Sequence, residues 1–208
     1  MLRRNLILSA LATPVVGGFG PAFAQEDKSD DMAPIEVKEM FLGDENAPVE
    51  LIEYASFTCP HCATFHTQVF PLLKAQYIDT GKVKFVTREV YFDRLGLWGA
   101  MLARCGDGSK YFGISDMLYK RQREWTQGDG GAVIAENLKK IGKIAGFDEE
   151  TVDACLQDRP TAEAMLERFK ETTAEHGVQS TPTLVINGVT HSNMGFEALA
   201  KLLDEAAG

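Results

Sequence analysis

Two cysteines three residues apart are the side chains in this sequence best suited to chemistry, and they lie in the motif Cys59-Pro60-His61-Cys62. We predict that the motif begins a helix, where free N–H groups and the helix dipole stabilise an anion at Cys59. A thiolate is the nucleophile in thiol–disulfide exchange. His61 can add a positive charge beside it, and Pro60 suits a first helical position because its missing N–H would have no partner there. Cys62, one turn further, is the predicted shielded resolving thiol.

Other uses of these thiols stay open at the level of sequence. A zinc or copper carrier would need more ligands, for which His61 and His66 are candidates, but no second pair stands at zinc-finger spacing. Haem attachment needs a histidine directly after the second cysteine, where Ala63 stands. A structural disulfide across so short a loop would stabilise the fold little. We therefore favour redox exchange, with no metal and no cofactor beyond the Cys59–Cys62 disulfide.

The segments around the motif predict an α/β fold. Apolar or alternating runs predict strands over residues 35–42, 49–55, 83–90 and 183–186, and the hairpin signal Asn187-Gly188 predicts a returning strand over 189–192. Apolar residues at three- and four-residue steps predict helices over 97–104, 114–122, 132–145, 149–156, 161–176 and 196–206. The helix after the motif has one apolar face, formed by Cys62, Phe65, Val69, Leu72 and Leu73. Pro71 is expected to kink this helix.

The start of the chain has the pattern of an export signal. A positive start, Met1 to Arg4, precedes an apolar stretch and the small-x-small sequence Ala22-Phe23-Ala24. We predict a cleaved signal peptide over 1–24, a flexible leader over 25–34 and a periplasmic location. A membrane anchor is the weaker alternative, because the run is short for a span and is interrupted by proline and glycines. The export route, general or twin-arginine, stays open.

The charge of the chain limits its partners. The formal net charge is −9, and cleavage after Ala24 would remove two arginines and no acids. So acidic a surface argues against nucleic acid, whose phosphates require a basic face. It also disfavours anionic membrane surfaces. We predict a mature protein that is not inserted in a membrane.

The motif, together with Ser180-Thr181-Pro182-Thr183 far downstream, resembles the DsbA family of bacterial periplasmic disulfide oxidants over about residues 35–206. The resemblance implies a thioredoxin fold, formed by 35–92 and 160–208, with a helical domain inserted over 93–159. It gives Cys59 the exchange with substrate and Cys62 the resolution of the mixed disulfide.

The resemblance also assigns the downstream loop. It implies that Pro182 is cis and faces the disulfide, although most X–Pro bonds are trans. Thr181 would then offer its backbone to an extended substrate strand. The best-known members carry valine at that place, so threonine leaves the redox poise open.

The activity implied is that of a monomer that donates its disulfide to unfolded exported proteins with free cysteines. A membrane quinone-linked partner would reoxidise it. A reductant or isomerase on the same fold is the alternative. Isomerases of this group carry a dimerisation domain ahead of the thioredoxin part, and only about ten residues separate the expected cleavage site from the first predicted strand.

Four other features carry predictions. Glu53 stands in an otherwise apolar strand, and the family has an acid at the matching position; buried beneath the disulfide, it would have a raised pKa and pass protons to Cys62. An outward-facing edge position is the alternative.

Cys105 and Cys155 are expected to form a structural disulfide within the insert, with two buried free thiols as the alternative. The remaining histidines are expected to be surface or packing residues: His66, His176 and His191. The run Lys120-Arg121-Gln122-Arg123 is expected to be a solvated helix end.

Overall fold

A five-stranded sheet organises residues 35–208, the part of the chain that the computed structural model describes. Its strands are β1 (Met40–Leu42), β2 (Val49–Ala55), β3 (Val83–Glu89), β4 (Thr183–Ile186) and β5 (Val189–Ser192), in the order β1-β3-β2-β4-β5. β2 and β3 are parallel, and every other neighbouring pair is antiparallel. The predicted signal peptide and leader lie outside the described residues.

β2 is the central strand, with the bounds that its apolar run predicts. Side chains alternate along a strand, so Leu51 and Glu53 face one layer of helices while Ile52 and Tyr54 face the other. All four are buried, which is why the run has no polar stripe.

The first strand is shorter than predicted. Residues 35–42 were expected to be extended throughout, but only Met40–Leu42 pairs with β3, from Met40 opposite Thr87 to Leu42 opposite Phe85. Upstream, the chain leaves the sheet edge and Glu39 binds Arg88 and Arg168.

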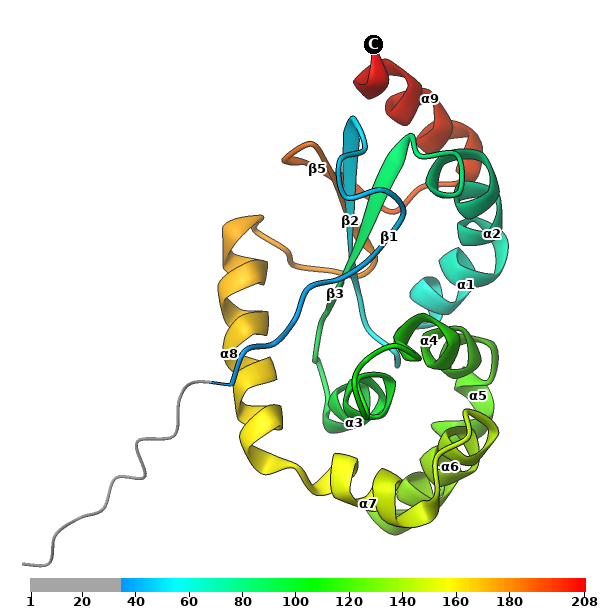
Figure 1. Cartoon of the computed structure of the whole chain (residues 1–208), viewed down its shortest axis with the longest axis vertical. Helices are drawn as coiled ribbons and strands as arrows, with labels where there is room; N and C mark the ends of the chain where they lie inside the picture. Colours follow the sequence, from blue (N-terminus) through cyan, green and yellow to red (C-terminus); the bar gives the residue numbers. More distant parts are fainter. Residues whose placement is uncertain (1–34) are drawn as a thin grey trace, which may run out of the picture. The chain divides into compact units, whose positions relative to one another are not determined.

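Helices cover both faces of the sheet, as Figure 1 shows. One face carries α1 (Pro60–Gln68), α2 (Phe70–Leu73) and α9 (Phe196–Ala207), whose apolar side chains share a core with β2 and β3. The other carries α8 (Arg159–Glu175), packed through Phe169. No helix within 35–208 is long and apolar enough to cross a bilayer.

The helix after the motif is broken, not simply kinked. α1 ends at Gln68, α2 begins at Phe70, and a π-helical turn, η1 (Lys74–Ile78), follows. The break lies just before Pro71, which has no N–H for a helical bond. Leu72, predicted on the apolar face, is 44% exposed because the break changes the helical phase.

The inserted helices gather beyond one end of the sheet (Figure 1). They are α3 (Arg94–Ala103), α4 (Tyr111–Lys120), α5 (Gln122–Trp125), α6 (Gly131–Ile144) and α7 (Glu149–Gln157). Their core contains the fully buried Trp125 and also Phe57 and Cys62, so the insert packs directly against the motif.

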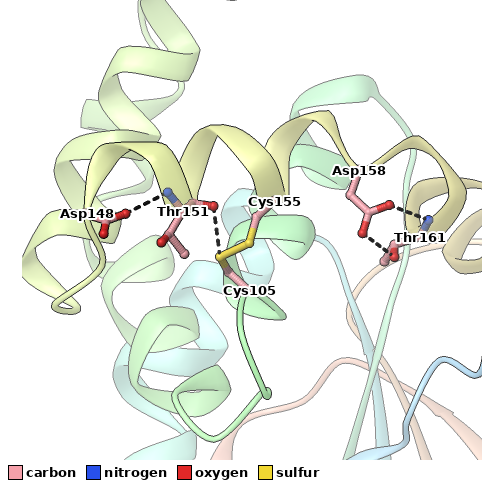
Figure 2. The surroundings of a disulfide bond; sticks show 6 residues. All are labelled: Cys105, Asp148, Thr151, Cys155, Asp158 and Thr161. Atoms are coloured by element: carbon pink, nitrogen blue, oxygen red, sulfur yellow. Dashed lines mark hydrogen bonds between the residues drawn. A yellow bond between two sulfur atoms is a disulfide. The ribbon is translucent and has the colours of Figure 1, made fainter.

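A disulfide joins the first and last helices of the insert. Cys105, just after α3, is bonded to Cys155 on α7, with their Cα atoms 5.6 Å apart. Figure 2 shows the caps on either side: Asp148 accepts from the N–H of Thr151, and Asp158 accepts from the N–H of Thr161.

Replacing both Cys105 and Cys155 by serine should lower the free energy of unfolding. The disulfide closes a loop of 50 residues, and the loss of that constraint on the unfolded chain is worth about 4 kcal/mol in the loop-entropy description. Urea unfolding of the oxidised proteins would measure the difference. In a reductant that opens the Cys59–Cys62 and Cys105–Cys155 disulfides, variant and wild type should have the same free energy of unfolding. An equal difference in this free energy with and without reductant would contradict the entropic origin.

Candidate active site

Cys59 stands at the N-cap of α1, and Pro60 occupies the first turn. The Cys59 backbone is extended, with φ −79° and ψ 118°, and its N–H bonds the Ser56 carbonyl at 3.1 Å. Cys59 is half-buried, whereas Cys62 is fully buried. Both thiols are reduced in this structure. One sulfur is therefore open to a partner and the other is shielded.

The surroundings of Cys59 favour its anion. A hydrogen bond from the Cys62 thiol is the largest influence on the pKa of Cys59. The Thr181 side chain and the backbone N–H groups of Cys62 and His61 contribute less. Together they lower the pKa of Cys59 to about 5, although burial acts in the opposite direction. His61 is exposed and contributes to this pKa through its backbone N–H.

Cys62 has the opposite environment. Burial raises its pKa far above the ordinary range, and the charges of Glu53 and Cys59 raise it further. At neutral pH the pair therefore holds one proton, on Cys62, and one negative charge, on Cys59. This asymmetry makes Cys59 the attacking and leaving sulfur.

Strand register brings the Thr181-Pro182 loop beside the motif. β4 runs antiparallel to β2 with Thr183 opposite Tyr54, so the residues just before β4 lie beyond the end of β2, where α1 begins. The Thr181–Pro182 peptide bond is cis. Sγ of Cys59 lies 3.4 Å from the Thr181 carbonyl oxygen, to which the thiol donates when it is protonated. Two segments more than 120 residues apart therefore meet at the reactive sulfur.

Glu53 is fully buried on the central strand, so the alternative of an outward-facing edge residue is wrong. Its Oε2 lies 3.0 Å from Nε2 of His66, which is 6% exposed and stacks on the Tyr119 ring. The Oε1 atom has no hydrogen-bond partner among the described residues, nor does Oγ1 of Thr87 on the adjacent strand.

The pairing of His66 with Glu53 was not predicted. The sequence analysis treated His66 as a surface or packing residue, and it does pack against Tyr119. Its place four residues after Cys62 puts both on one face of α1. That spacing is the signal that could have found it.

The insert holds the segment before Cys59. The Thr58 hydroxyl donates to Asp93 at 2.7 Å, and the other oxygen of Asp93 caps α3 through the N–H of Gly96. A Cβ on Gly96 would lie 3.0 Å from the Ser56 hydroxyl, so a small residue is needed for this close approach. Asp93 lies just before α3, and Gly96 lies within its first turn.

Gln122 is a correction to the sequence analysis. The run from Lys120 to Arg123 was expected to be solvated, and its three basic residues are exposed, but Gln122 is only 7% exposed. Its amide donates to the carbonyls of Phe57 and Cys59. A glutamine at the last position of a predicted helix gives no sequence signal for this contact.

The sequence left metal ligation open as an alternative use of the thiols. Within residues 35–208, no three His, Cys, Asp or Glu side chains are grouped to hold an ion. Of the two candidate histidines, His61 is exposed and His66 is bound to Glu53.

Comparison with known proteins agrees with this fold. The thioredoxin family model matches residues 36–205, and the chain belongs to that family. A solved structure of alpha-DsbA1 from Wolbachia pipientis superposes with a TM-score of 0.75 at 26% identity, over 86% of this chain and 96% of that one. The fold is therefore the thioredoxin fold of DsbA proteins.

Two relatives, both from bacteria, carry names that refer to disulfides. A Rickettsia bellii protein, named as an inferred protein-disulfide oxidoreductase, is 33% identical over 83% of this chain. Disulfide bond formation protein D of Bacillus subtilis is 28% identical over 70% of this chain. The chain spans 66% of the length of each.

Two substitutions of Cys62 would test the origin of the Cys59 anion. Cys62→Ala removes the largest stabilising hydrogen bond, so the pKa of Cys59 should rise from about 5 toward the ordinary range. Cys62→Ser keeps a donor of similar size and should leave the pKa low. Rates of alkylation by iodoacetamide across pH would measure both. Equal pKa values in the two variants would show that the Cys62 thiol is not the main cause.

Proposed function

We propose that this chain is an exported thiol:disulfide oxidoreductase that donates its Cys59–Cys62 disulfide to newly exported proteins. One observation carries the proposal: the pKa of Cys59 is about 5, while that of its partner Cys62 is raised by burial. A stable Cys59 thiolate favours the reduced protein, and this makes the disulfide a strong oxidant. Each tenfold change in that equilibrium corresponds to about 30 mV.

The reaction runs through two exchanges at one sulfur. A substrate thiolate attacks Sγ of Cys59, the Cys59–Cys62 bond breaks, and its electron pair goes to Cys62. A second substrate thiolate then attacks the substrate sulfur of the mixed disulfide, and Cys59 leaves as the stable thiolate. The substrate gains a disulfide, and the protein is left with two reduced cysteines.

The buried Cys62 thiolate formed in the first exchange requires a proton. Glu53 lies on the face of β2 that α1 covers, and its charge influences the pKa of Cys62. With the ring hydrogen of His66 on Nε2, that group donates to Oε2, and Oε1 has no hydrogen-bond partner among the described residues. We assign Glu53 as the proton donor, held in place by His66.

Substrate and partner follow from the same site. The Thr181 backbone beside Cys59 can pair with an extended segment of an unfolded protein, by β-augmentation. The reduced protein must pass its two electrons to an oxidising partner before it can react again. We propose that this partner is a quinone-linked membrane protein outside the cytoplasm. The family resemblance of the site supports both assignments and a monomeric state.

Equilibration with glutathione buffers tests the proposed direction. The reduction potential of the Cys59–Cys62 couple should be about −120 mV, the value of strong oxidants. A potential of about −270 mV is the value of thioredoxin-like reductants. Trapping of both thiols followed by mass measurement would report the state of the pair, with Cys59→Ser as the control that cannot cycle. A value at the reducing end would transfer the assignment to the reductant alternative.

Stability should depend on pH differently in the two redox forms. Between about pH 5 and about pH 8.5, Cys59 is ionised in the folded reduced protein but protonated in the unfolded chain. The unfolded chain then binds more protons, so the stability of the reduced form rises with pH across this window and falls as pH drops through 5. The oxidised form lacks this thiol. Denaturant unfolding of both forms should therefore give a difference that grows with pH; a constant difference would contradict the anion.

Glu53→Gln should slow oxidation of a dithiol peptide. Without a titratable oxygen near Cys62, the rate should fall by a factor on the order of 10². Stopped-flow measurement of the first turnover across pH would report the rate. Glu50→Gln, on the same strand but part-exposed and paired with Lys84, is the matched control and should react like wild type. An unchanged rate in Glu53→Gln would remove this residue from the mechanism.

A further inference from the structure

We propose that Gln122 is a positioning residue through which the inserted helical domain sets the redox poise of Cys59. The inference rests on the proposed function and adds a residue to its machinery. Gln122 belongs to α5, in the insert, and is 63 residues from Cys59 in sequence.

The contact uses both hydrogens of one amide. Nε2 of Gln122 donates to the Phe57 carbonyl at 2.8 Å and to the Cys59 carbonyl at 2.9 Å. The Cys59 carbonyl also accepts the first helical bond of α1, from the N–H of Ala63 at 3.1 Å. The amide therefore holds the carbonyls of Phe57 and Cys59, the residues on either side of Thr58. It thereby fixes the direction in which the chain enters α1.

This geometry bears on the anion in two ways. The N-cap conformation of Cys59 aims its sulfur at the first turn of α1, and the amide holds that conformation from the side of the insert. The amide dipole also offsets the negative end of the Cys59 carbonyl, which would otherwise repel a thiolate on the same residue. Both effects favour the reduced protein over the oxidised one.

The position of Gln122 is itself firmly anchored. The last residue of α5 is Trp125, which is fully buried and donates from Nε1 to the Leu118 carbonyl at 2.9 Å. Burial of a polar side chain costs free energy unless it is hydrogen-bonded, and the donor group of Gln122 is used entirely on the active-site segment. Packing within the insert alone would not require a side chain with two hydrogen-bond donors at position 122.

Gln122→Met tests the proposal, because it keeps the volume and removes both donors. We expect the equilibrium constant with glutathione to shift about tenfold toward the oxidised protein, about 30 mV, and the pKa of Cys59 to rise. Ser115→Ala is the matched control: it removes a buried hydrogen bond within the insert, from Oγ of Ser115 to the Tyr111 carbonyl at 2.8 Å, without touching Gln122 or the two carbonyls. It should lose stability in both redox forms equally and keep the wild-type potential and the wild-type pKa.

A potential and a Cys59 pKa unchanged in Gln122→Met, with stability lost equally from both forms, would overturn the proposal and make Gln122 structural. Should that variant fail to fold, Gln122→Glu replaces the donors by a carboxylate of equal size, and the same shift is expected. A wild-type potential at the reducing end would refute the proposed oxidant role, but the difference between variant and wild type would still decide the role of Gln122.

Discussion

The stabilisation of a sulfur anion at the first turn of α1 is the interaction on which the rest of this structure depends. Cys59 receives a hydrogen bond from the Cys62 thiol and further ones from the backbone N–H groups of the turn, and its pKa falls to about 5. Such groups at a helix start have no intrahelical partners, so they are free to serve an anion. Because the thiolate belongs only to the reduced protein, every contact that favours it adds to the oxidising power of the disulfide.

The shielding of Cys62 completes this arrangement. Its sulfur lies between α1 and the insert, in the same core cluster as Phe57 and Trp125. Burial keeps that thiol protonated, so it donates to Cys59 and does not compete as a nucleophile. The cost is a proton that must enter and leave a buried site. We propose that Glu53 carries it; one oxygen of Glu53 is bound to His66, and the other has no hydrogen-bond partner among residues 35–208.

Three separate parts of the chain converge on the reactive sulfur. The start of α1 carries it, the loop before β4 presents the Thr181 carbonyl to it, and α5 of the insert fixes the carbonyl of Cys59 itself. The insert is thus part of the active-site support as well as a cover. Its own first and last helices are joined by the Cys105–Cys155 disulfide.

The sequence by itself determined the local elements and the reactive pair. The bounds of β2 and β4 agree with their apolar runs, and β5 follows the Asn187-Gly188 turn as that hairpin signal predicts. The motif lies at the start of α1, because hydrophobic period, turn chemistry and helix-start chemistry are local properties. Register and packing are not local, so only the tertiary structure decided the partner of Glu53, the length of β1, the exposure of Leu72 and the burial of Gln122. The length of β1 and the burial of Gln122 depend on segments far away in the chain, the partner of Glu53 depends on how α1 packs on β2, and the exposure of Leu72 depends on the helix break before Pro71. The identity of a single residue carries no record of which group will lie against it.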